Sequence, residues 1–283
     1  MIILEKIMEL KRPFISAASG LVEIDGKFFV IADDENFIGI YDLETQSGVS
    51  VDIFNESLPA EKSLRKKNKR DFEALVHLPK QKQVLLVPSG STINRERGAL
   101  ISEAGVFQKE FSFHIIFSEL RKHFPEINIE GGVVVDEQLW LFQRGNGLQN
   151  LNGLIKLNLA DFLANKVVQP EIVLIDLGAV QGTNLTFTDA TKADKNILFL
   201  AVAENSLSTY DDGSVMGSIL GIMGRNGDVI CTTPLATTSK PEGLCYSSSK
   251  KCFYLVTDDD NRQYSSILLR GNLPAEWMTI LIS

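Results

Sequence analysis

Short hydrophobic runs recur along the chain in a fixed order, and a polar turn separates each run from the next. In the first copy, residues 21–24 lead through an Asp-Gly turn to residues 27–32, and further runs follow at 37–43 and 49–54. An Asp-Gly pair between two apolar runs is a strong signal for a β-hairpin. The pattern therefore predicts a unit of four antiparallel strands.

The same order of runs recurs four more times. The equivalent runs lie at 74–78, 84–87, 97–101 and 111–117; at 131–135, 139–142, 154–159 and 171–177; at 185–189, 197–203, 218–223 and 228–235; and at 243–246, 252–256 and 266–270. Four antiparallel strands per copy are typical of a propeller blade, so we expect an all-β, five-bladed β-propeller. An irregular blade within 90–130 or within the long fourth copy would make it six-bladed.

The repeats account for nearly all of the chain, which predicts one propeller domain over residues 1–283. The apolar segment at about 2–10 has the place of a fourth strand without its first three, so we expect it to close the ring with the last blade. Residues 278–282 are a rival for that place. Short helices are expected in the insertions at 59–69, 118–123 and 158–165.

One polar residue opens the first strand of each copy, at intervals of 54, 57, 54 and 58 residues. These openers are Ser19, Glu73, Glu130, Asn184 and Glu242. Equivalent positions of successive blades recur around one axis, so all five side chains are expected at one mouth of the central channel. Each hairpin returns the end of its second strand to the same mouth, which adds Asp33, Asp34, Ser89, Ser91, Arg144, Glu204 and residues 258–260.

Three converging carboxylates repel one another unless a cation or a proton neutralises them. Glutamate, serine and asparagine oxygens together form a ring of hard ligands, which predicts Ca²⁺ as the bound ion. The alternative is a metal-free polar cluster, in which the glutamates pair with Arg70, Arg144 or Lys240 or accept hydrogen bonds from backbone N–H groups. Asp33, Asp34 and the acidic residues 258–260 are interpreted as solvated loop tips, with a second cation site as the alternative.

Composition narrows the choice of partners. The net charge of −8 argues against nonspecific binding to nucleic acid, and no apolar run reaches the length of a membrane span, roughly 18 residues. The charged residues Glu5, Lys6 and Glu9 interrupt the first apolar segment, so it does not resemble a signal peptide. Three cysteines favour reduced thiols and a cytoplasmic location; a periplasmic or secreted location follows if a leader has been removed.

A basic run precedes the second opener and consists of Lys62, Arg65, Lys66, Lys67, Lys69 and Arg70. It is interpreted as a solvated loop, or as a lobe over the mouth that attracts a small anionic ligand. In that second case Arg70, Arg144 and Asp258 are the candidate ligand-binding residues.

Several motifs resemble two propeller families. Glu242-Gly-Leu, the run Val-Thr-Asp-Asp-Asp at 256–260 and the Leu-Leu-Arg at 268–270 resemble the phytase-like (esterase-like) family of bacterial propellers. The spaced openers resemble the calcium-activated nucleotidase (apyrase) family, which implies an axial Ca²⁺ held by Ser19, Glu73, Glu130, Asn184 and Glu242. Asn184 departs from the serine of that family, although its amide oxygen can still bind a cation.

Two functions follow as expectations. The first is a binding or scaffold module with an axial Ca²⁺ and an unassigned ligand. The second is a Ca²⁺-dependent hydrolase of phosphate esters or anhydrides, with Glu73 or Asp33 as general base. A serine hydrolase is disfavoured, because no Gly-x-Ser-x-Gly motif is present and His77 is interpreted as a packed residue.

Overall fold

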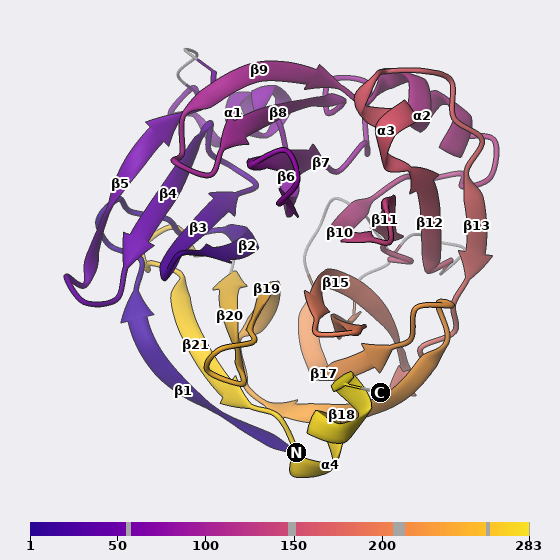
Figure 1. The fold of residues 1–283 in the computed structure, drawn as a ribbon. Coiled ribbons are helices and arrows are strands. Elements are labelled where there is room, and N and C mark those ends of the chain that lie inside the picture. Colours follow the sequence, from indigo (N-terminus) through magenta and orange to yellow (C-terminus); the bar gives the residue numbers. More distant parts are fainter. Residues whose placement is uncertain (55–57, 147–150, 206–212, 259–260, 283) are drawn as a thin grey trace.

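The apolar runs form strands that are arranged around a central axis (Figure 1). The computed structural model describes residues 1–283 apart from 55–57, 147–150, 206–212, 259–260 and 283. Three separate sheets have four antiparallel strands each, in chain order from the innermost to the outermost strand. They are β2 (Ala18–Ile24), β3 (Lys27–Ala32), β4 (Phe37–Asp42) and β5 (Ser47–Asp52); β6 (Phe72–Leu78), β7 (Gln83–Pro88), β8 (Arg97–Ser102) and β9 (Phe107–Ser112); and β10 (Ile129–Val135), β11 (Gln138–Gln143), β12 (Gly153–Asn158) and β13 (Glu171–Leu174).

The rest of the ring is one nine-stranded sheet with the order β14-β15-β16-β17-β18-β1-β21-β20-β19. Its strands are β1 (Ile2–Glu9), β14 (Ala179–Val180), β15 (Thr183–Ala193), β16 (Asn196–Asn205), β17 (Ser214–Met223), β18 (Val229–Ala236), β19 (Lys240–Ser247), β20 (Cys252–Asp258) and β21 (Ile267–Asn272). The all-β prediction is confirmed and the arrangement is that of a propeller, but this continuous sheet was not expected.

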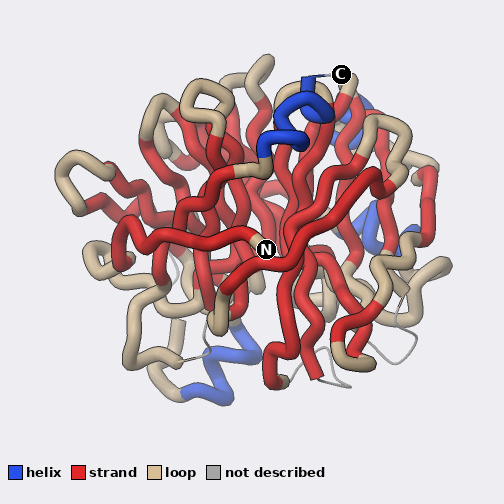
Figure 2. Tube along the Cα trace, turned by 90° about the horizontal axis from the view of Figure 1, so that it is seen from below, coloured by secondary structure: helices blue, strands red, loops and turns tan. Residues whose placement is uncertain are grey.

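A short parallel pairing joins the two halves of the nine-stranded sheet. Ile2 of β1 pairs with Leu235 of β18, and Ile3 pairs with Ala236. On its other side β1 runs antiparallel to β21, so the first strand of the chain lies beside one of its last. The rival segment at 278–282 is not a strand: it belongs to helix α4 (Ala275–Ile282), which leads to the C-terminal end at one face of the molecule (Figure 2).

Three further helices lie in the connections: α1 (Lys62–Asn68), α2 (His114–Leu120) and α3 (Leu159–Leu163). Helices α1 and α3 fall in insertions predicted to be helical, whereas α2 overlaps the predicted helix at 118–123 only over residues 118–120. The predicted strand at 111–117 is wrong beyond Ser112, where β9 ends and α2 follows. Phe113, Ile116, Phe117 and Leu120 are buried at helical spacing, so their aromatic and aliphatic groups reach one core from a helix. No helix in the described part of the chain is long and apolar enough to cross a membrane.

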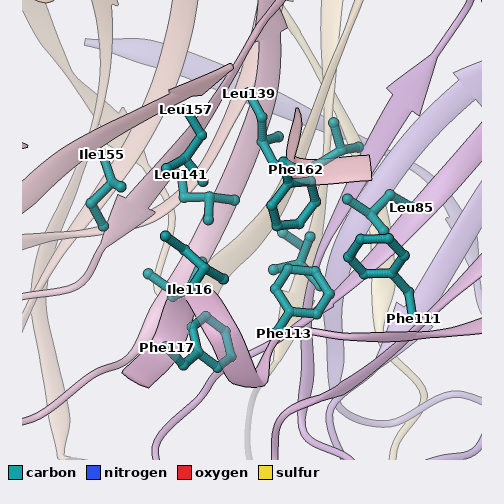
Figure 3. Packing of buried hydrophobic residues seen from close by; sticks show 14 of the residues in the cluster. Leu85, Phe111, Phe113, Ile116, Phe117, Leu139, Leu141, Ile155, Leu157 and Phe162 are labelled. Atoms are coloured by element: carbon teal, nitrogen blue, oxygen red, sulfur yellow. The ribbon is translucent and has the colours of Figure 1, made fainter. Parts of the chain in front are cut away.

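The hydrophobic core lies mainly between neighbouring sheets. In the cluster of Figure 3, Leu85 of β7 and Leu139 and Leu141 of β11 pack with phenylalanines from β9, α2 and α3. Phe111 and Phe162 lie with their ring centroids 5.0 Å apart and link β9 to α3. Because each sheet is held by the next, the inner strands are kept in register around the axis.

Candidate functional site

Each of the five innermost strands is interrupted at one residue where its pairing with the next strand shifts in register. The residues at these shifts are Ser19, Glu73, Glu130, Thr188 and Glu242. The strands themselves form a closed ring, in which β2 contacts β6 and β19, and β10 and β15 complete the circle. Repeated bulges of this kind re-aim one side chain per strand.

In the fourth repeat, the structure shows that the predicted opener, Asn184, is wrong. Its equivalent residue is Thr188, whereas Asn184 lies four residues earlier, is exposed and pairs with Ala179 of β14. The structure therefore does not place Asn184 in the ring of openers. Thr188 gives intervals of 58 and 54 residues, which are as regular as those from Asn184, so spacing alone could not separate the two.

The two hydroxyl members of the ring connect neighbouring inner strands. Ser19 Oγ donates a hydrogen bond to the carbonyl oxygen of Phe72, at 2.5 Å. Thr188 Oγ1 donates in the same way to the carbonyl oxygen of Pro241, at 3.0 Å. In both cases the acceptor is the residue directly before the glutamate of the next strand, so these hydroxyls help to hold the glutamate backbones in place.

The three glutamates converge. One carboxylate oxygen from each of Glu73, Glu130 and Glu242 lies within 4.8 Å of the other two. Their exposed fractions are 7%, 4% and 5%, so the carboxylates meet in a nearly dry site. The prediction that these openers come together at one mouth is met for these three side chains.

Two cations border Glu130 and Glu242. Arg144 Nη1 lies 3.3 Å from Glu130 Oε1 and 3.8 Å from Glu242 Oε1, and its other terminal nitrogen binds Glu204. Lys240 Nζ lies 2.9 Å from Glu242 Oε1. Part of the alternative metal-free arrangement is therefore present, with Arg144 and Lys240 in the places expected of counter-ions.

A second acidic group adjoins Glu73. Asp33, Asp71 and Glu73 also bring one carboxylate oxygen each within 4.8 Å. Lys69 follows helix α1 and binds Asp33 as well as Asp71, with 2.8 Å to Asp71 Oδ1. Asp71 also accepts from Arg95 at 2.7 Å and holds a φ of 60°, a backbone conformation that is costly outside glycine.

Burial shapes the electrostatics of this mouth. It raises the pKa of Glu73 well above its usual range, and the charges of Glu130 and Asp71 raise it further. Burial raises the pKa of Glu130 to about 7 despite Arg144, and that of Asp33 to about 6 despite Lys69. Asp71 differs: its pKa is lowered, because Lys69 and Arg95 outweigh burial. Glu73 forms no ion pair within 4.0 Å to a described residue.

If every group is ionised, the cluster has two more negative than positive charges. We name this set the carboxylate mouth: Asp33, Asp71, Glu73, Glu130, Glu204 and Glu242, with the four cations Lys69, Arg95, Arg144 and Lys240. Glu73 belongs to both carboxylate groups. The excess charge therefore centres on a side chain without its own counter-ion.

Other predicted site residues lie elsewhere. Arg70 places its guanidinium 5.2 Å from the ring centre of Phe54, so it stacks on an aromatic ring away from the carboxylate mouth. Asp34 is bordered by Arg262, with Oδ2 3.3 Å from Arg262 Nε. Asp258 is buried at the end of β20, and residues 259–260 lie outside the described residues.

Sequence reasoning missed Asp71, Arg95 and Thr188. Asp71 stands two residues before Glu73, a position that the repeat does not mark, and Arg95 belongs to the connection between β7 and β8. For Asp71 the local signal was the dense charge around residues 62–73.

Just inside the carboxylate mouth the inner strands come very close together. A Cβ on Gly131 would lie 3.0 Å from the backbone nitrogen of Ala190, and one on Gly243 would lie 3.0 Å from the backbone of Gly20. Asp189 stands at the equivalent position of β15. Its Oδ1 accepts from the N–H of Ala190 and its Oδ2 from the N–H of Leu244, each at 2.7 Å.

These features define a β-propeller with a buried carboxylate mouth. The chain belongs to a family of unknown function, DUF6929, which it matches over residues 14–273. No curated protein matches the sequence.

Among solved structures, the glutaminyl cyclase of Myxococcus xanthus is similar over 96% of this chain and 98% of its own, with 11% identity and a TM-score of 0.56. A luciferin-regenerating enzyme is similar over 97% and 96%, with 8% identity and a TM-score of 0.50. At these identities the likeness supports the fold alone. Neither the family nor these structures identify the phytase-like or nucleotidase families that the motifs resemble.

Proposed function

We propose that the chain is a single five-bladed propeller domain and a binding module whose carboxylate mouth holds Ca²⁺. The count of five is supported by the five inner strands and by the nine-stranded sheet, which divides into two antiparallel sets where β1 meets β18 in parallel. In this arrangement β1 supplies the outermost strand of the last blade.

The excess negative charge at Glu73 is the observation that carries the proposal. The two positive charges of Arg144 and Lys240 neutralise the three negative charges of Glu130, Glu204 and Glu242 only in part. Lys69 forms its ion pairs with Asp33 and Asp71. A buried carboxylate without a counter-ion is costly, so it must either bind a proton or bind a cation. The raised pKa of Glu73 describes the first case, and a divalent ion would match the excess charge in the second.

The available ligands suit Ca²⁺ better than a transition metal. Glu73, Glu130 and Glu242 offer only oxygen, and no histidine or cysteine belongs to either described acidic group. Calcium accepts six to eight oxygen ligands in irregular geometry, and water can complete such a shell. A bound Ca²⁺ would neutralise the three carboxylates and leave coordination positions open to an oxygen atom of a small anionic ligand.

Calorimetric titration with Ca²⁺ tests the proposal directly. We expect wild-type protein to bind Ca²⁺ and its thermal midpoint to rise with Ca²⁺ concentration. Glu73→Gln should weaken binding roughly tenfold or more, because it removes one charged ligand. In EDTA the same variant should be at least as stable as wild type, since it removes a carboxylate that has no counter-ion.

Glu110→Gln is the matched control. Glu110 lies on outer strand β9, is exposed and pairs with Arg97, so this change removes a charge without touching the mouth. The proposal fails if wild-type protein does not bind Ca²⁺, or if Glu73→Gln and Glu110→Gln bind it equally well.

A hydrolase of phosphate esters or anhydrides is the second candidate. The observation that favours it is the raised pKa of a buried, unpaired Glu73, a property typical of general acids and bases. Turnover of a nucleoside diphosphate or p-nitrophenyl phosphate with Ca²⁺ would support it, provided that Glu73→Gln removes the activity and keeps the fold. Ca²⁺ binding without turnover would exclude the hydrolase and favour the binding module.

A further inference from the structure

A cavity of about 590 Å³ opens at the other end of the inner strands. Its wall is formed by the second halves of these strands and by the turns that follow them, among them residues 79–81 and 136–137. The close approach of the strands at Gly131 and Gly243 lies between this cavity and the carboxylate mouth. Its volume is in the range of small-molecule sites, roughly 300 to 1,000 Å³.

The wall combines an apolar surface with charged groups. Leu21, Leu75, Val134 and Ala190 come from four different inner strands and supply the apolar part. A ligand with a short aliphatic or aromatic group could bury that group against them.

Most polar groups of the wall are already bound to protein. Lys80 pairs with Glu137 across two turns, and Asp136 pairs with Arg225. His77 lies 2.8 Å from Glu103, and the hydroxyl of Tyr246 donates to Asp194 at 3.2 Å. These groups leave little charge to offer a ligand.

Among the charged residues of the wall, Glu23 and Lys192 are the exceptions. Neither side chain forms a hydrogen bond or an ion pair with any described residue, although both line the cavity and the charge of Lys192 helps to lower the pKa of Asp136. Glu23 is partly buried near the end of β2, and Lys192 is exposed near the end of β15.

The repeat places the two charges at the same level of the ring. Each stands four residues after the residue at the register shift, Glu23 after Ser19 and Lys192 after Thr188. Strands β2 and β15 are not neighbours: β19 lies between them, and both contact it. The cavity thus carries one carboxylate and one ammonium group that form no ion pair with a described residue, and Cys245 and Tyr246 of β19 line the wall between their strands.

We propose that this cavity binds an apolar zwitterion, either a free α-amino acid or a short peptide. The ammonium group of the ligand pairs with Glu23, its carboxylate pairs with Lys192, and its apolar side chain lies against Leu21, Leu75 and Val134. A ligand with both charges satisfies both side chains, whereas a ligand with one charge leaves the other unpaired.

Calorimetry and thermal shift with L-leucine, L-phenylalanine and the dipeptide Leu-Leu test this site. We expect at least one of these to bind, and its analogues without the amine or without the carboxylate to bind roughly tenfold more weakly or not at all. Binding of leucine or phenylalanine identifies a free amino acid, and binding of Leu-Leu alone identifies a peptide.

Variants connect the binding to the two charges. Glu23→Gln and Lys192→Gln should each weaken the bound zwitterion roughly tenfold, whereas Lys80→Gln, which alters a paired lysine of the same wall, should not. Circular dichroism verifies that each variant is folded. The proposal is overturned if none of the three probes binds, or if neither Glu23→Gln nor Lys192→Gln weakens the binding. Because Glu73 is at the other mouth, this result is independent of Ca²⁺ binding.

Discussion

Single residues determine how closely the inner strands of this propeller approach one another. At the position after the register shift, four of the five repeats have glycine or alanine: Gly20, Ala74, Gly131 and Gly243. The fifth has Asp189, which uses both carboxylate oxygens to accept backbone N–H groups, one within its own strand and one in β19. Its role is structural, since it connects two inner strands.

At this scale we predict that Asp189→Asn destabilises the protein. An asparagine offers one carbonyl oxygen and turns its amide group toward the second N–H donor, so one buried donor loses its acceptor. The free energy of unfolding should fall by about 1–3 kcal/mol in urea titrations. Asp161→Asn, at a partly exposed position, should change it by less than about 0.5 kcal/mol. Equal effects of the two changes would argue against this role.

At the scale of elements, the segment after β9 shows how tertiary packing selects a helix. Residues 111–117 have the aromatic content of a strand, yet α2 begins at His114 and buries Ile116, Phe117 and Leu120. Phe117 stacks on Phe113 with ring centroids 5.3 Å apart and also covers Gly90, where a Cβ would lie 2.7 Å from its ring.

We therefore expect Phe117→Ala to leave a cavity between the second and third sheets and to cost about 3–5 kcal/mol of unfolding free energy. Chemical denaturation measures this cost, and Lys122→Ala, at an exposed position just after α2, is the control. A cost near that of the control would show that α2 is not part of the core.

At the scale of the whole molecule, the carboxylate mouth joins residues from all five repeats. Its charges should therefore control how stability depends on pH. The pKa of Glu130 is raised from 4.5 to about 7 in the folded protein, and the pKa of Glu73 shifts in the same direction. Between these values the folded state binds more protons than the unfolded state, so stability is lost as the pH rises.

In EDTA we accordingly expect the free energy of unfolding to decrease from about pH 4.5 to about pH 7, and Ca²⁺ to remove part of this decrease. Urea titrations across this range measure the slope. Glu130→Gln should flatten it, whereas Glu110→Gln should leave it unchanged, because the pKa of Glu110 is lowered by Arg97. A slope that Glu130→Gln does not alter would contradict this assignment.

The sequence alone determined the strand class, the repeat and three of the converging carboxylates. Hairpins are specified by neighbouring residues, and Glu73, Glu130 and Glu242 each precede a small residue and an apolar run. These signals are local, so they could be followed without coordinates.

Only the tertiary structure decided which groups meet these carboxylates. Thr188 rather than Asn184 completes the ring because a register shift in β15 selects it, and such a shift depends on pairing with β16. Arg144 reaches Glu204 and Glu242 from another repeat, Lys240 reaches Glu204, and β1 lies between β18 and β21. Such contacts join residues far apart in the chain, and their formation depends on the packing of all the sheets around the axis.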